Sequence, residues 1–78
     1  MTKKVIESYT VFANQWTEEF LTIYDDHTVV STVLDRSGGS NYETTWHWEH
    51  FLNLHLHNED NGYKEAVKKI LELMKSLN

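Results

Sequence analysis

The stretch YKEAVKKILELMKSL, residues 63–77, decides the fold. Its apolar residues recur every three or four positions, which is the spacing of one face of an α-helix. They are Tyr63, Ala66, Val67, Ile70, Leu71, Leu73, Met74 and Leu77. Burying this stripe roughly balances the cost of ordering the helix, so the helix is not stable alone. We therefore expect an amphipathic helix that packs on a surface formed by the preceding residues.

Length and composition limit what that surface can be. A chain of 78 residues forms a single domain, residues 1–78, with one core. It contains no cysteine, which excludes disulfides, thiolate metal ligands and a cysteine nucleophile. No apolar run approaches the ~20 residues of a membrane span, and Met1 to Lys4 lead into a mixed polar stretch rather than a signal-peptide core. The sequence predicts a cytoplasmic protein without membrane contact.

Three segments before residue 40 have the character of β-strands. Lys3–Phe12 alternates apolar and polar residues, and Thr28–Asp35 is the most strand-like part of the chain. Trp16–Tyr24 fits both a strand and a helix. We favour a strand there because residues 22–24 are β-branched or aromatic and because a turn, Asp25–His27, leads directly into the next strand. These segments predict two successive antiparallel connections.

The strongest turn is Arg36–Ser40, because paired glycines adopt positive φ at no steric cost. The chain then runs back through Tyr42, Thr44 and Trp46 as a fourth strand.

Residues 46–57 fit a period of two and a period of 3.6 equally well. A strand from residue 41 to 57 would be unusually long, so we place the end of the strand near Trp46 and a short helix at about Trp48–His57. Thr44 or Thr45 is the expected N-cap of the short helix. The polar residues 58–62 then interrupt the chain, and Asp60 or Asn61 is expected to cap the final helix.

These elements define an α+β fold of two layers. We expect a four-stranded antiparallel sheet with strand order close to a meander. The C-terminal amphipathic helix covers one face of the sheet, and the second, short helix flanks it. The first or fourth strand could leave an uncovered edge, so a homodimer is open.

Charge is distributed unevenly along the chain. Residues 1–60 contain ten acids and three bases, whereas residues 61–78 contain two acids and four bases. A net-negative surface repels phosphate backbones, and the bases form no stripe along an aromatic strand. We therefore expect no direct binding of nucleic acid and a protein partner with a basic surface. The simpler interpretation is that the acids serve only solubility.

No pattern in the sequence indicates catalysis. The chain has no Gly-x-Ser-x-Gly and no glycine-rich phosphate loop, and its carboxylate pairs are adjacent rather than placed across a cleft. The sequence therefore predicts that the protein is not an enzyme, with no catalytic residues and no cofactor.

Four of the five histidines fall within residues 47–57, so a metal site has to be weighed. On a strand, His55 and His57 would share a side with His47 and Glu49, a ligand set that zinc accepts. On a helix these residues do not converge, and no His-Glu-x-x-His pattern is present. We expect no metal site and keep a histidine-based metal-binding protein as an alternative.

Protein binding has positive support. Acidic residues beside aromatic anchors are typical of a surface that docks on a basic partner. The candidate partner-binding residues are Glu18, Glu19, Asp25, Asp26, Trp48 and Glu49. We expect a small acidic inhibitor or adaptor that acts by occupying the nucleic-acid-binding surface of its target. The alternative is a small-molecule or nucleotide binder that uses the rings of Trp46, Trp48 and Tyr42.

In its layout the chain resembles the small phage-encoded inhibitors of bacterial defence, the anti-CRISPR proteins in particular. The likeness consists of a short acidic chain without cysteine, a run of strands around Trp16 to Leu34 and a terminal helix at Tyr63 to Leu77. It implies an inhibitor that binds a nucleic-acid-handling protein. It carries over no functional residue.

Overall fold

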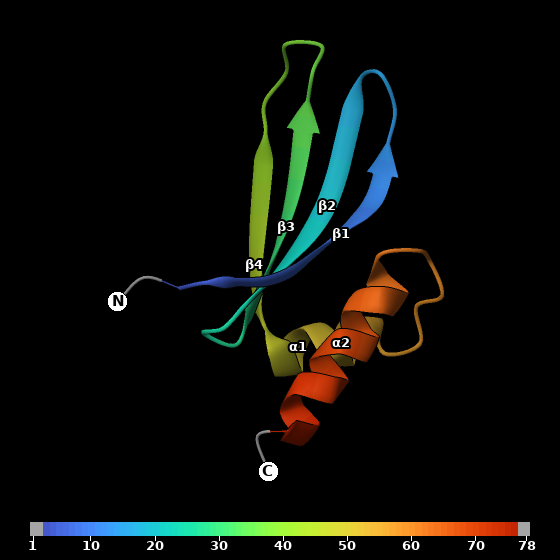
Figure 1. The fold of residues 1–78 in the computed structure, drawn as a ribbon. Helices are drawn as coiled ribbons and strands as arrows, with labels where there is room; N and C mark the ends of the chain where they lie inside the picture. Colours follow the sequence, from blue (N-terminus) through green and yellow to red (C-terminus); the bar gives the residue numbers. More distant parts are fainter. Residues whose placement is uncertain (1–2, 77–78) are drawn as a thin grey trace.

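Four antiparallel strands form one sheet in chain order, and two helices cover one of its faces (Figure 1). This arrangement is a computed structural model that describes residues 3–76. The strands are β1 (Val5–Ala13), β2 (Thr17–Tyr24), β3 (Thr28–Asp35) and β4 (Tyr42–His47), and the helices are α1 (Trp48–His55) and α2 (Tyr63–Ser76). The expected α+β meander with a C-terminal helix and a second short helix is confirmed. Leu77, the predicted last residue of the final helix, lies outside the described residues.

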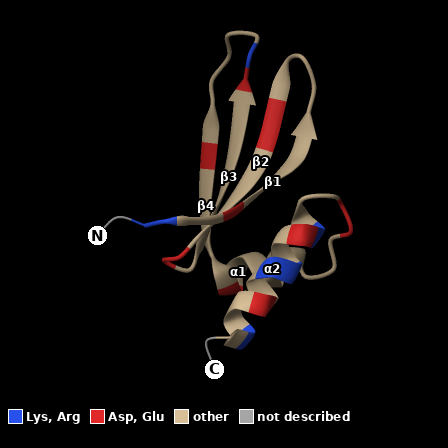
Figure 2. Cartoon of the chain, viewed as in Figure 1, with Lys and Arg blue, Asp and Glu red and all other residues tan. Residues whose placement is uncertain are grey.

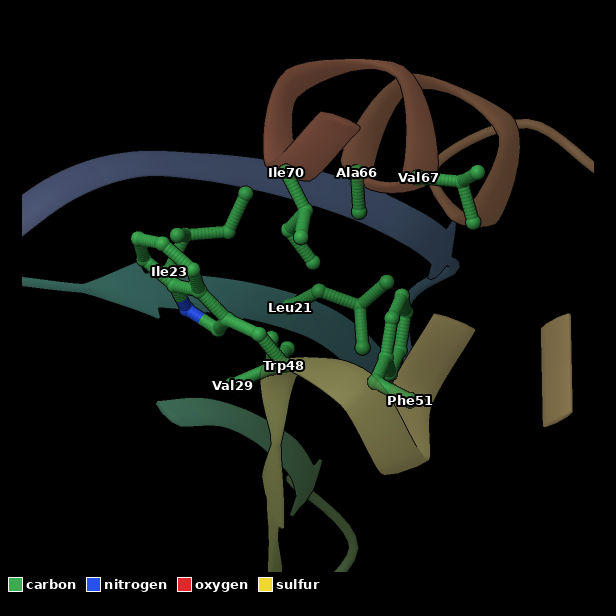
Figure 3. Packing of buried hydrophobic residues seen from close by; sticks show 8 residues of the cluster. All are labelled: Leu21, Ile23, Val29, Trp48, Phe51, Ala66, Val67 and Ile70. Atoms are coloured by element: carbon green, nitrogen blue, oxygen red, sulfur yellow. The ribbon is translucent and has the colours of Figure 1, made fainter. Parts of the chain in front are cut away.

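The core lies between the two helices and the central strands. Ile23, Val29 and Trp46 are register partners across three strands, so their side chains share one face of the sheet. We call this side the helix face and the opposite side the open face. The buried residues of this core come from β2, β3, α1 and α2 (Figure 3), and they are Leu21, Ile23, Val29, Trp48, Phe51, Ala66, Val67 and Ile70. The apolar stripe of α2 therefore packs on the sheet, as its periodicity predicts.

The ambiguous segment at residues 46–57 divides at Trp48. The backbone N–H of Trp48 donates to the carbonyl of His27 at 2.8 Å, and its indole N–H donates to the carbonyl of Thr28 at 3.1 Å. These bonds fix the point where the strand becomes a helix. Thr44 and Thr45 lie inside β4, so their predicted role as N-cap is wrong; His47 takes that position without a side-chain cap bond.

The start of α2 also differs from expectation. The Glu65 carboxylate accepts a hydrogen bond from the backbone N–H of Gly62, which is one half of a capping box. Gly62 has φ of 88° and is buried against β1. The predicted cap by Asp60 or Asn61 is wrong, because the residue that ends the loop has to be a glycine to fit against the strand.

The two edges of the sheet are built differently. β1 is broken by register shifts between Val5 and Glu7 and between Thr10 and Phe12, and α2 packs beside it. β4 pairs with β3 in a continuous register without a bulge. Neither helix has the length and apolar content that crossing a membrane requires.

Candidate functional site

The four acids predicted from β2 and the turn after it do not form one surface. Glu18 and Glu19 lie near the start of β2, whereas Asp25 and Asp26 follow its end, roughly 20 Å away at the rise of a strand. Glu18 and Glu19 also point to opposite faces, because side chains alternate along a strand.

Each of these acids has a partner within the chain. Glu18 forms an ion pair with Arg36 at 2.9 Å, and Asp25 accepts a hydrogen bond from the backbone N–H of Lys4 at 2.8 Å. Asp26 accepts hydrogen bonds from the hydroxyl and the N–H of Thr28, and the hydroxyl bond lowers the pKa of this carboxyl. Asp25 and Asp26 thus stabilise the β2–β3 turn.

Trp48 is a core residue. Its side chain is 3% exposed, and the ring of His27 stacks on it with centroids 4.5 Å apart. The expectation that Trp48 is a surface anchor is therefore wrong. Glu49 is exposed in the first turn of α1, where a carboxylate suits the helix dipole. Trp48 and Glu49 together therefore present no exposed aromatic ring to which a partner could bind.

The end of the sheet formed by the β1–β2 and β3–β4 turns lies farthest from the helices (Figure 1), and three exposed aromatic residues belong to this end instead. Phe12 is 50% exposed, Trp16 57% and Tyr42 64%. They flank the β1–β2 turn and the β3–β4 turn. Single exposed apolar residues are normal on a protein, but aromatic rings grouped at one end indicate an interaction surface. We call this end of the sheet the sheet tip; it carries Phe12, Glu19 and Tyr42 on the helix face and Trp16, Glu18 and Glu43 on the open face.

Each face of the sheet tip carries both aromatic and acidic side chains. On the helix face, one row of register partners runs Phe12, Glu19, Val33, Tyr42 across all four strands. Trp16 and Glu18 belong to the open face by the alternation along β2. Figure 2 shows acidic bands on β2 and β4 in this part of the sheet. Arg36 follows the end of β3, in the β3–β4 turn, and pairs with Glu18.

A hydrogen bond ties the sheet tip to α2. The Tyr63 hydroxyl donates to the Glu19 carboxylate at 3.0 Å. Burial and this hydrogen bond raise the pKa of Tyr63 to about 12. Tyr63 therefore stays protonated at neutral pH and holds the Glu19 carboxylate at the border between the helix layer and the exposed rings.

The histidines do not form a metal centre in the part of the chain that the structure describes. Among residues 3–76, no group of three or more His, Asp or Glu side chains is placed to hold a metal ion. His55 is instead a packing residue. Its ring stacks on Tyr63 at 4.4 Å and contacts Phe51 at 4.8 Å, and the side chain of Asn58 lies within hydrogen-bond distance of its Nδ1.

The packing of His55 predicts a loss of stability in mild acid. Burial lowers the pKa of His55 from its usual 6.5, so the folded state binds this proton less readily than the unfolded state. The stability that neutral His55 contributes is fully present above pH ~6.5 and is lost as pH falls through the lowered pKa of the folded state. Urea unfolding of wild type, His55→Gln and the exposed control His57→Gln at pH 7.5 and 5 measures this loss. We expect His57→Gln to lose as much stability as wild type and His55→Gln to lose less; equal losses in all three would exclude His55 as the cause.

The aromatic rings suggested for a nucleotide site are not brought together. Trp48 is enclosed and Trp46 packs on Phe51, while Tyr42 lies at the other end of β4. A groove of about 120 Å³ lies elsewhere, between β1 and α2. Tyr9, Glu65, Lys68, Lys69 and Glu72 line it. Its volume is below the ~300 Å³ of ordinary ligand pockets.

The chain was compared with models of protein families, with curated proteins and with solved structures, and none of them matches it. The sheet tip is therefore the feature from which a function can be inferred.

Proposed function

We propose that this protein is a small acidic inhibitor that binds a basic surface of a nucleic-acid-handling protein through its sheet tip. The observation that supports this proposal is the exposure of the rings of Phe12, Trp16 and Tyr42 beside carboxylates at the turn end of the sheet, where the Tyr63–Glu19 hydrogen bond marks the border of the helix layer. Rings of this kind provide contact area at low entropic cost, and carboxylates select a basic partner and speed its encounter.

The charge distribution supports the same partner. Lysines are confined to the N-terminal residues and α2, whereas the sheet tip carries Glu18, Glu19 and Glu43 (Figure 2). A basic surface that normally holds phosphates fits this end of the molecule better than the lysine-bearing face of α2. Occupying such a surface would exclude nucleic acid. Anti-CRISPR proteins, which the chain resembles in layout, are inhibitors of this class.

The test is capture of a target followed by measurement of its activity. Tagged protein is incubated with bacterial lysate at low and moderate salt, bound proteins are identified by mass spectrometry, and the captured target is purified. We expect a basic nucleic-acid-binding protein that is released by salt and whose binding to nucleic acid falls when this protein is added.

Matched variants assign the surface. The double variant Phe12→Ser with Trp16→Ser removes two exposed rings, and we expect at least a tenfold loss of affinity, as for hot-spot residues. Leu71→Ser removes an exposed apolar side chain from α2 (46% exposed) and should bind as wild type does. Glu43→Gln should flatten the salt dependence. Unchanged affinity in the double variant would exclude the sheet tip, and failure to capture any basic protein would contradict the proposed function.

A further inference from the structure

Among residues 3–76, no strand pairs with the outer edge of β4, so this edge presents backbone groups without a partner strand. The N–H of Trp48 donates to the carbonyl of His27, which fixes the residues of β4 that face β3. Inward and outward groups alternate along an antiparallel strand. Tyr42, Thr44 and Trp46 therefore bond to β3, and the backbone groups of Glu43, Thr45 and His47 point away from the sheet. Within residues 3–76, β4 contacts β3 and α1 and no other strand or helix.

Apart from the charge of Glu43, this edge lacks the devices that keep edge strands apart. The pairing of β1 is interrupted by two register shifts, and the loop at Gly62 lies directly on the strand: a side chain at position 62 would meet the Thr10 carbonyl at 2.9 Å. β4 has no bulge, no proline and no lysine, and Tyr42–Thr45 are exposed. An edge that is regular and unprotected readily accepts another strand.

We propose that β4 pairs antiparallel with β4 of a second copy of this chain, with a two-fold axis at Thr44. An antiparallel edge is self-complementary, because each copy supplies the donors and acceptors that the other needs. The two sheets then form one continuous sheet with both helix layers on the same side. This inference does not rest on the proposed function.

The chemistry of the edge selects the axis at Thr44. An axis at Glu43 would place the two Glu43 carboxylates opposite each other, which is unfavourable. An axis at Thr45 would need the His47 carbonyl as an acceptor for the second copy. His47 is the N-cap of α1, so its carbonyl already accepts the first hydrogen bond of that helix. This axis would also bring the second copy against α1. With the axis at Thr44, Glu43 bonds to Thr45 of the second copy.

The same register gives a partner to an exposed ring. Tyr42, which is 64% exposed, lies opposite Trp46 of the second copy on the helix face. Cross-strand aromatic pairs of this kind stabilise sheets. Phe12 and Trp16 lie on the β1–β2 hairpin, away from this edge, and remain free. The dimer interface thus takes Tyr42 and Glu43 from each sheet tip and leaves Phe12 and Trp16 of each copy at the two outer ends of one sheet.

Cysteine cross-linking tests the register directly, because the chain has no cysteine of its own. In Thr44→Cys the two new side chains form a non-hydrogen-bonded pair, with Cα atoms about 4.5 Å apart, which suits a disulfide. In the control Thr45→Cys the two positions are displaced by two residues along the strands, beyond the ~7 Å limit. We expect Thr44→Cys to give a covalent dimer under mild oxidation at least tenfold faster than Thr45→Cys. Equal rates would overturn the register.

Sedimentation over a concentration series tests the association itself. Wild type should approach twice the 9.2 kDa of one chain as concentration rises. Thr45→Pro removes an outward N–H without removing a bond to β3, so it should fold, as judged by circular dichroism, and stay monomeric. Thr45→Val keeps the N–H and should dimerise.

A monomeric wild type, or a dimer that Thr45→Pro leaves intact, would overturn the proposal. If Thr45→Pro fails to fold, the cross-linking result decides. If monomers of this protein instead paired β4 with a strand of another protein, the edge would serve a different partner and the dimer proposal would also be overturned.

Discussion

Phe51→Ala is expected to cost about 3–5 kcal/mol of unfolding free energy, the largest effect of any single truncation considered for this protein. Phe51 is fully enclosed. It packs on Trp46 at 5.8 Å and on Tyr63 at 6.3 Å between ring centroids, so it joins β4 to the start of α2. Domains of this size have only about 5–15 kcal/mol of total stability. The variant should therefore be partly unfolded in water.

Urea unfolding followed by circular dichroism measures this loss. Leu54→Ala is the matched control, because Leu54 lies in the same helix and is 55% exposed. We expect its stability to change by less than about 1 kcal/mol. If the two variants have similar midpoints, the placement of Phe51 at the centre of the core is wrong.

Gly62→Ala is expected to destabilise the protein by roughly 2–4 kcal/mol, the sum of a conformational cost and a steric cost. Gly62 has φ of 88°, a conformation that residues with a Cβ adopt at a cost. An added Cβ would lie 2.8 Å from Cγ2 of Val11, 2.9 Å from the Thr10 carbonyl and 3.0 Å from Cα of Val11. Two of these atoms belong to the backbone of β1 and cannot turn away, so the loop would have to leave the strand.

Gly38→Ala separates the two costs. Gly38 also has positive φ, 98°, but an added Cβ would meet nothing within 4 Å. We expect a loss of about 1–2 kcal/mol, from the conformation alone. Thermal or urea unfolding of both variants gives the comparison. Equal losses at the two positions would show that the contact between Gly62 and β1 contributes nothing.

The fold follows from patterns that are local in the sequence. The period of α2, the strand Thr28–Asp35 and the turn at Arg36–Ser40 each indicate one structure, and each is confirmed, with Gly38 but not Gly39 at positive φ. The caps were not predictable in the same way. Gly62 and Glu65 form the cap of α2 because β1 lies against the loop before the helix. A local sequence pattern cannot predict the position of a strand about fifty residues away.

The candidate site was harder to predict, because it depends on where the helix layer ends. Composition indicated aromatic rings among acids, but Trp48 is a core residue. One signal was present in the sequence: Trp16 and Tyr42 flank the turns, while α1 begins directly after β4 without a loop. The helices must therefore lie near the far end of β4, which leaves the turn end of the sheet uncovered.

The meander order of the sheet also has a consequence for how the chain folds. Each strand pairs with its neighbour in sequence, so both hairpins and the β2–β3 pair close over short loops. α2 is different, because it docks on β1 and β2, the elements farthest from it along the chain. The sheet can assemble early with its helix face still exposed to water. We therefore expect docking of α2 to be the late step of folding and its reversal to expose Leu21 and Ile23 to proteases and to other chains.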